Sequence, residues 1–156
     1  MKVIDNFLPE YQFKQLQSSM MSGEFPWYYN PGINTTYEKD LYQFTHTIFV
    51  DQSQKSPWPF LELFRSLLNV NTWVRVKANL RPRTFFHRSA GYHTDCADMT
   101  TAIYYPDTNN GWTQFKKGGK VKSVANRIVI FDSSLKHSGF SCTDEKIRVV
   151  LNFNWE

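Results

Sequence analysis

The chain has 156 residues, 41% of them hydrophobic and 17% aromatic, so it is long enough to bury a core as one domain. The formal net charge of +4 is compatible with binding to nucleic acid, but most of the basic residues are scattered along the chain. The one basic cluster, at residues 116–120, is interpreted as the end of a solvated hairpin. Two cysteines, Cys96 and Cys142, exclude a disulfide scaffold and a structural zinc motif, and we expect free thiols.

The first 70 residues combine helical and extended patterns. Residues 3–8 are typical of an edge strand, and Pro9 opens a helix that extends to about Met21. Residues 25–42 show no clear period and predict a long loop. A strand at residues 44–50 precedes a second helix, which is expected to start at Ser56 and Pro57.

After Asn71 the pattern changes to short strands. Residues 73–80 alternate, which places on one face Val74, Val76, Ala78 and Leu80, and on the other Trp73, Arg75, Lys77 and Asn79. Further strands are predicted at residues 100–105, 111–115, 120–124, 127–131 and 147–153, with turn signals between them. Many short strands after two helices predict a mainly β fold, an antiparallel double-sheet jelly roll with supporting helices.

Four residues of the second half carry the chemistry: His93, Asp95, His137 and Arg148. On an extended strand, His93 and Asp95 would point to the same side, and later strands would bring His137 and Arg148 to the same cavity. Two imidazoles and one carboxylate form a ligand set that leaves open positions on Fe(II), and an arginine can hold a dicarboxylate co-substrate. The pattern indicates oxygenase chemistry.

The blocks around these residues resemble the catalytic core of the 2-oxoglutarate and Fe(II)-dependent oxygenases, in the prolyl 4-hydroxylase-like branch. They lie at residues 92–95, 101–105, 110–115, 126–131 and 137–139, followed by Arg148. The resemblance covers residues 73–155 strongly and the first 70 residues more loosely. It implies a double-stranded β-helix, a cupin-like jelly roll, in a single oxygenase domain at residues 1–156, with helical support at about 1–70.

The resemblance also implies a role for each site residue. His93, Asp95 and His137 would ligate Fe(II), and Arg148 would pair with the distal carboxylate of 2-oxoglutarate. With O₂ as the second co-substrate, the enzyme would release succinate and CO₂ and hydroxylate a peptide side chain or a small molecule. Many members carry a hydroxyl residue two positions after the arginine, where this chain has Val150. A second hydrogen bond to the carboxylate is therefore expected from Tyr104 or Asn79.

Several further residues are candidates around this centre. The loop at residues 27–34 and the segment at residues 83–92 are expected to contact substrate, with Phe85, Phe86 and His87 closing over it. Asp132 or Ser133 is a candidate to anchor His137. The common Gly-Gly of the middle hairpin is Gly111-Trp112 here, and the indole would either narrow the pocket mouth or pack in a core.

Alternative functions remain open at the level of sequence. The same chemistry could act on a methylated base or a nucleotide, although the scattered charge argues against nucleic acid. A non-catalytic metal-binding jelly roll and a zinc hydrolase or isomerase on a cupin-like barrel are the other readings. No signal peptide and no apolar run of the ~18 residues that a membrane span needs is present. We therefore expect a cytoplasmic protein without a membrane partner.

Overall fold

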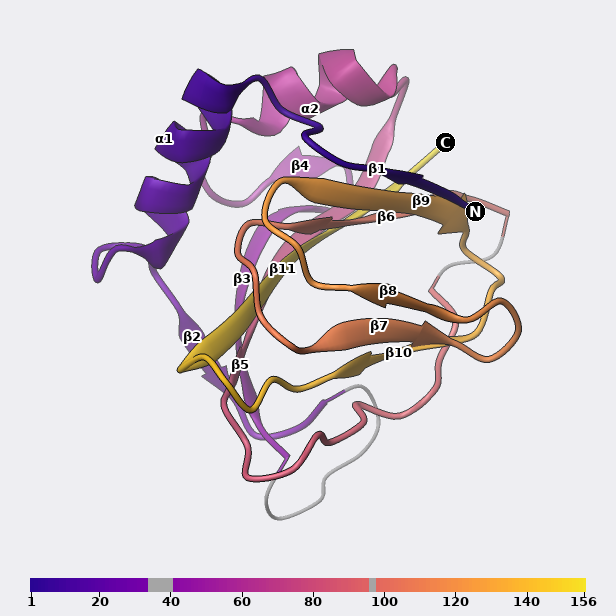
Figure 1. Cartoon of the computed structure of the whole chain (residues 1–156). Helices are drawn as coiled ribbons and strands as arrows, with labels where there is room; N and C mark the ends of the chain where they lie inside the picture. The colour runs from indigo at the N-terminus through magenta and orange to yellow at the C-terminus, as the bar shows by residue number, and fades with distance from the viewer. Residues whose placement is uncertain (34–40, 96–97) are drawn as a thin grey trace.

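Two antiparallel sheets face each other in the computed structural model, which describes residues 1–33, 41–95 and 98–156 (Figure 1). The larger sheet contains β1 (Lys2–Ile4), β2 (Tyr28–Asn30), β3 (Gln43–Val50), β4 (Ser53–Gln54), β5 (Trp73–Pro82), β6 (Thr100–Tyr105), β9 (Arg127–Asp132) and β11 (Ile147–Trp155). The smaller sheet contains β7 (Trp112–Phe115), β8 (Lys120–Lys122) and β10 (His137–Phe140). Strand order is β1-β9-β6-β11-β5-β3-β2 in the first, where β4 pairs with β3, and β10-β7-β8 in the second.

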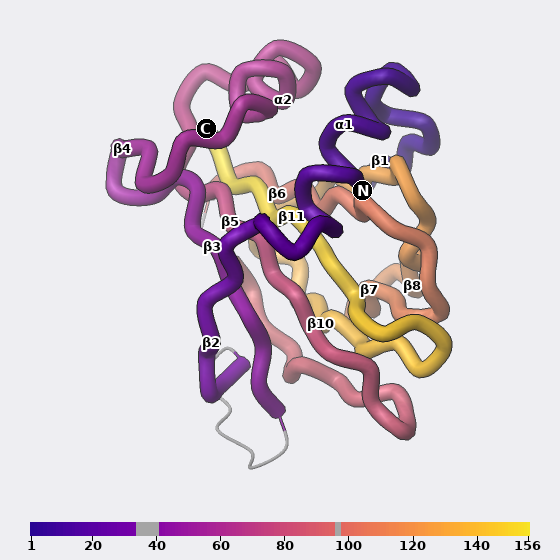
Figure 2. Tube along the Cα trace, turned by 90° about the vertical axis from the view of Figure 1, so that its left-hand side faces the viewer, coloured from indigo at the N-terminus to yellow at the C-terminus, as the bar shows by residue number. Residues whose placement is uncertain are grey.

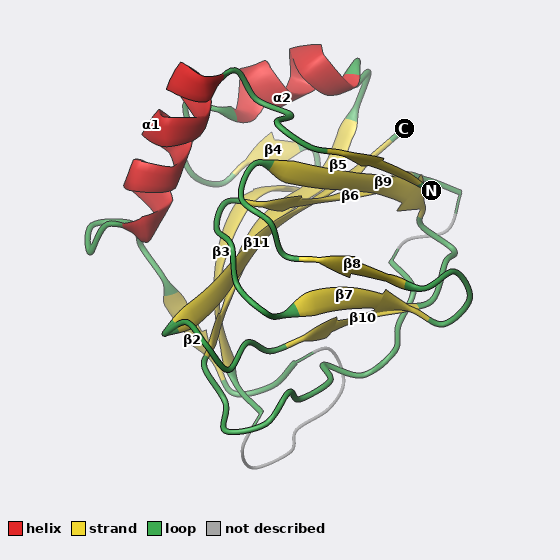
Figure 3. Cartoon of the chain, viewed as in Figure 1, coloured by secondary structure: helices red, strands yellow, loops and turns green. Residues whose placement is uncertain are grey.

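Two helices cover the outer face of the larger sheet, on the side away from the smaller one (Figure 3). The first, α1 (Glu10–Met21), follows Pro9 as predicted and buries Leu16 and Met20. The second, α2 (Leu61–Leu68), begins five residues later than expected. Pro57 and Pro59 explain the delay, because a proline disfavours helical geometry in the residue before it. The first intrahelical bond therefore joins the amide of Phe64 to the carbonyl of Phe60.

Strand alternation separates the two faces of the larger sheet. On β11, Val149, Leu151 and Phe153 pack under the helices, while Val150 belongs to a second core between the sheets. The other members of that second core are Ile103, Tyr105, Phe115, Val121, Val129 and Phe131. Residues of even number on β11 therefore face the space between the sheets, where a site would lie.

Several strand predictions need correction. The edge strand expected at residues 3–8 ends early, because β1 ends at Ile4. The loop expected at residues 25–42 contains β2, which pairs with β3 at the sheet edge (Figure 2), while residues 34–40 lie outside the described residues. The segment of β10 was not expected as a strand, yet it pairs with β7. On β5, Trp73 rather than Val74 lies in the helix-covered core, because the register with β11 shifts between Asn154 and Trp155. Such a bulge gives β5 one extra residue, so the residues that precede the bulge point to the opposite face of the sheet from the one that simple alternation predicts.

Cys142 is buried as a free thiol, as expected, whereas Cys96 lies outside the described residues. Among the helices that the structure describes, none combines the length and the apolar character that crossing a bilayer requires.

Candidate metal and co-substrate site

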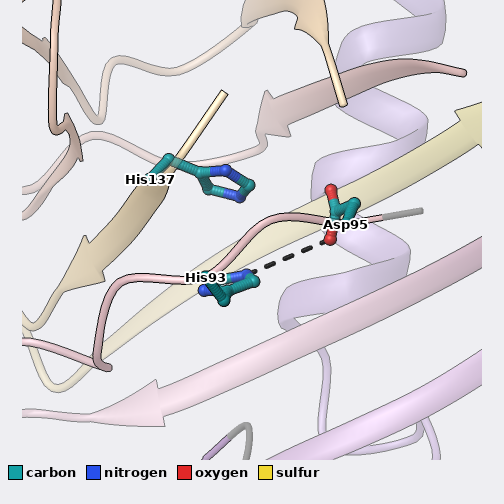
Figure 4. A group of neighbouring side chains, drawn as sticks. All are labelled: His93, Asp95 and His137. Carbon is teal, nitrogen blue, oxygen red and sulfur yellow. Dashed lines mark ion pairs between the residues drawn. The ribbon is translucent and has the colours of Figure 1, made fainter. Parts of the chain in front are cut away.

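His93, Asp95 and His137 converge between the two sheets (Figure 4). One ligand atom from each side chain lies within 4.8 Å of the others, and His93 Nε2 lies 4.0 Å from Asp95 Oδ1. The backbone holds them together, because His93 and His137 form a bridge with N–H to O=C distances of 3.0 and 2.9 Å, and the Asp95 amide donates to the Ser133 carbonyl. The structure thus brings together the three residues that the sequence proposed as ligands.

Each imidazole is oriented by a nearby carbonyl. The Nδ1 atom of His93 lies 3.2 Å from the Gly91 oxygen, and that of His137 lies 2.9 Å from the Leu135 oxygen. Because a carbonyl only accepts, each Nδ1 carries the hydrogen, and Nε2 of the neutral ring carries the lone pair that a metal needs. Leu135, not Asp132 or Ser133, therefore anchors the His137 side chain.

The carboxylate of Asp95 is held by three side chains. Its Oδ1 accepts from Arg75 at 3.0 Å, while its Oδ2 accepts from Thr101 at 3.1 Å and Asn154 at 3.2 Å. Burial acts to raise the pKa of Asp95, but Arg75, His137 and Asn154 outweigh it and lower the pKa. The carboxylate is therefore negatively charged and fixed in orientation at neutral pH.

Burial also lowers the pKa of His137, so its imidazole is neutral at physiological pH and able to bind a metal. Two imidazoles with oriented Nε2 atoms and one charged carboxylate match the facial ligand set of non-haem Fe(II) sites. By the chemistry of its donor atoms, the site fits such a metal.

A cavity of about 470 Å³ extends from these ligands between the sheets. Its lining includes all three ligands, Arg148 and Asn79. The two guanidinium bonds of Arg148 run to the smaller-sheet side, to Ser123 Oγ at 3.0 Å and Thr113 Oγ1 at 3.3 Å. Arg148 is 3% exposed, so the predicted carboxylate-binding residue is a buried cation in the same cavity as the triad.

A hydrogen bond links Arg148 to the smaller sheet close to His137. Thr113, which accepts a hydrogen bond from Arg148, pairs with Gly139 on β10, two positions beyond His137. Two residues of a strand span about 7 Å, comparable to the length of a five-carbon dicarboxylate. A Cβ on Gly139 would lie 3.4 Å from Arg148 Nη1, so the guanidinium passes close to this glycine.

The structure does not bring Tyr104 to the cavity. Alternation on β6 places Tyr104 on the helix-covered face, where its ring contacts Phe7 and Phe64 and its hydroxyl donates to Asn126. Its neighbour Tyr105 faces inward instead, and Arg148 lies 5.8 Å from the centre of its ring. Tyr104 therefore cannot supply the second carboxylate contact that the sequence analysis sought from it.

The two segments expected to contact substrate border the cavity in part. Asn30 and Ile33 line it from the first segment, and Ala90 lines it from the second. Phe85 and Phe86 are 92% and 74% exposed and do not belong to the lining. Trp112 neither narrows the cavity nor enters the main cores, because its ring stacks on Phe140 at 4.6 Å.

Sequence reasoning missed two arginines of the cavity wall, Arg75 as the partner of Asp95 and Arg81 beside Arg148. Alternation contained the signal for both. Arg75, Lys77 and Asn79 share one face of β5, and continuing the same period adds Arg81. Partners that lie far away in sequence, such as Asn154, had no comparable local signal.

No protein-family model and no curated protein matches the sequence. Solved structures do match its fold. An oxidoreductase of the 2OG-Fe(II) oxygenase family from Burkholderia pseudomallei aligns with a TM-score of 0.72 and 9% identity over 99% of this chain and 84% of its own. A prolyl hydroxylase from Trichoplax adhaerens, in complex with a hypoxia inducible factor peptide fragment, aligns with a TM-score of 0.64 and 12% identity. This alignment covers 99% of this chain and 82% of the hydroxylase.

HygX from Streptomyces hygroscopicus, with nickel and 2-oxoglutarate bound, aligns with a TM-score of 0.64 and 12% identity over 98% of this chain and 81% of its own. At these identities the likeness concerns the fold. It confirms the jelly roll predicted from the sequence and the structural resemblance to the 2-oxoglutarate and Fe(II)-dependent oxygenases.

Proposed function

We propose that residues 1–156 form one Fe(II)- and 2-oxoglutarate-dependent dioxygenase domain, which hydroxylates a peptide side chain or a small molecule and releases succinate and CO₂. The observation that carries this proposal is that one cavity contains both the His93, Asp95 and His137 set and the buried Arg148. A metal with a purely structural role has no use for a buried cation in the same cavity.

The residues have distinct roles in this proposal. His93, Asp95 and His137 would hold Fe(II) from one side, which leaves its other positions for co-substrate and O₂. Bound there, the metal would supply the oxidative chemistry that couples decarboxylation of 2-oxoglutarate to hydroxylation. Arg148 would orient 2-oxoglutarate through its distal carboxylate, and the amide of Asn79 would offer that ligand a hydrogen-bond donor.

The surroundings of the ligands support this assignment. Arg75, Thr101 and Asn154 fix the carboxylate of Asp95, so no rotamer search is needed when metal binds. Ile103 and Val150 give the cavity apolar wall next to its polar groups. The substrate would enter between residues 27–33 and residues 83–92. The solved neighbour that binds a peptide supports a peptide as the substrate.

Succinate formation tests the proposal without knowledge of the substrate, because uncoupled turnover consumes 2-oxoglutarate alone. Protein loaded with Fe(II) under anaerobic conditions should produce succinate only after O₂ is admitted. His93→Ala and Arg148→Ala should abolish production, whereas Arg65→Ala, a change on α2 outside the cavity, should retain it. Failure of the folded parent to form succinate under O₂ would refute the proposed reaction.

A further inference from the structure

Two buried arginines lie directly opposite each other in the wall of the cavity. Arg81 on β5 and Arg148 on β11 are register partners, are 6% and 3% exposed, and both line the cavity. The same ladder pairs Arg75 with Asn154, and these two side chains bind Asp95. The arginine pair is thus six positions along β5 from the residues that hold the carboxylate ligand.

Both guanidinium groups approach Gly139 on β10. Arg81 donates from Nη1 to the Gly139 carbonyl at 2.9 Å, and Arg148 Nη1 would lie 3.4 Å from a Cβ at the same residue. Among the described residues, neither arginine forms an ion pair with a carboxylate. The negative charge of Asp107 acts on Arg148 without a hydrogen bond between them, and the Oδ2 atom of Asp107 accepts its side-chain hydrogen bond from Asn109.

Two like charges in a buried site repel each other, and a bound anion relieves this repulsion. Burial and the neighbouring Arg148 lower the pKa of Arg81 to about 10, which still leaves its guanidinium group charged at neutral pH. Burial also lowers the pKa of Arg148. Each group has five N–H donors, of which Arg81 uses one and Arg148 two in bonds to the described residues. Donors in a planar fork match the geometry of a carboxylate.

We infer that Arg81 and Arg148 together form a two-guanidinium site for one carboxylate of a dicarboxylate ligand. This inference rests on the proposed function, in which the ligand is 2-oxoglutarate and the group bound is its distal carboxylate. Arg81 then supplies the second hydrogen bond to the distal carboxylate. Val150 has no hydroxyl for this bond, and Tyr104 lies in the helix-covered core, away from the cavity. The cavity recognises the carboxylate with two charged donors from neighbouring strands.

Equilibrium binding tests this inference directly. Calorimetry would measure the affinity of the Mn(II)-loaded protein for 2-oxoglutarate and for 2-oxopentanoate, which lacks the distal carboxylate. Losing a hydrogen bond to a charged group corresponds to roughly a ten- to hundredfold change in affinity. Arg81→Met should weaken 2-oxoglutarate by that factor and leave 2-oxopentanoate unchanged. Arg148→Met should do the same, and Arg65→Met should bind both ligands like the parent.

Thermal unfolding separates ligand binding from a structural role. Without ligand, Arg81→Met should melt no lower than the parent because it removes repulsion between buried charges, and it should gain less from added 2-oxoglutarate. Arg81→Lys retains the charge without the fork and should lose affinity severalfold, which decides the matter even if the methionine variant does not fold. Unchanged 2-oxoglutarate affinity in either folded variant would overturn the inference.

The outcomes for the site and for the reaction are separable. Arg81-dependent binding of 2-oxoglutarate in a protein that forms no succinate would refute the proposed function and retain the two-arginine site. Oxygen-dependent succinate with binding that depends on Arg148 alone would retain the function and refute the site.

Discussion

At the scale of single residues, the side chain of Arg148 leaves no room for a Cβ atom at Gly111. A Cβ on Gly111 would lie 2.6 Å from Arg148 Cδ and 2.9 Å from the carbonyl oxygen of Phe140. The sequence showed Gly111-Trp112 only as a departure from a common pair of glycines. The structure explains the glycine by the passage of the arginine, and it places the indole against Phe140 outside the cavity.

Gly111→Ala should therefore damage the site as well as the fold. The added methyl group meets a backbone oxygen that cannot move freely, so we expect a loss of about 1–3 kcal/mol in the free energy of unfolding, typical of overpacking. Arg148 should also shift and weaken 2-oxoglutarate binding. Urea denaturation and calorimetry measure the two effects. Gly23→Ala is the matched control, because a Cβ there meets nothing within 4 Å, and equal effects of both changes would contradict this explanation.

Thr101→Val tests the support of the metal ligand. Valine has nearly the same shape but no hydroxyl to donate to Asp95 Oδ2 or to accept from Asn154. Loss of such an outer contact typically weakens metal binding roughly 10–100-fold. Titration with Mn(II) against a competing chelator measures this change. The hydroxyl of Thr47 bonds to no described residue, so Thr47→Val should bind Mn(II) like the parent. Equal affinity in the parent, Thr101→Val and Thr47→Val would refute the role of Thr101.

Asp107→Asn tests the effect of a buried carboxylate on stability at different pH. Burial raises the pKa of Asp107 above its ordinary 3.8, so the folded protein takes up a proton before the unfolded chain does. The charged carboxylate therefore lowers stability near pH 7, and this cost disappears as the pH falls. The variant should exceed the parent in free energy of unfolding at pH 7, and the difference should narrow toward pH 4.

Denaturation at several pH values measures that difference. Asp51→Asn controls for the loss of one negative charge at an exposed position. A difference between Asp107→Asn and the parent that widens as the pH falls would contradict the sign of the effect.

At the scale of elements, successive side chains of β5 and β11 point alternately to the two faces of the larger sheet, and each face has a different role. Residues of one parity pack under α1 and α2, and residues of the other parity line the cavity. The sequence predicted both strands and the apolar face of β5 apart from its first residues, because period-two patterns are local. It did not predict the bulge at Trp73 or the pairing of β2, because these depend on the register between strands. The late start of α2 was also missed, although the prolines before the helix explain it.

Phe64→Ala should show that α2 supports the site only indirectly. Phe64 is fully buried and stacks on Phe153 at 4.5 Å and on Trp58 at 5.7 Å. Its removal should cost about 3–5 kcal/mol in the free energy of unfolding. Mn(II) affinity of the folded fraction should stay unchanged, since Phe153 faces away from the cavity. Leu67→Ala, at a 42% exposed position, should cost far less, and similar losses for both would contradict the packing described.

At the scale of the whole molecule, the sequence predicted more of the site than of the fold around it. His93, Asp95, His137 and Arg148 were recognisable because the spacing of these residue types is distinctive, and the structure gathers all four around one cavity. The residues that orient them come from distant strands, and Arg75, Thr101 and Asn154 meet Asp95 only after the sheet has formed. No local pattern identifies such contacts.

The central claim is that the ligand triad and the arginine end of the cavity form one site. Calorimetric titration of 2-oxoglutarate into the protein with and without Mn(II) tests it most directly, because two parts of one site must show coupled binding. We expect Mn(II) to increase the affinity for 2-oxoglutarate at least tenfold in the parent, and Asp95→Ala to abolish that increase. Equal affinity with and without metal in the folded parent would mean that the triad and Arg148 act separately, and would contradict the account.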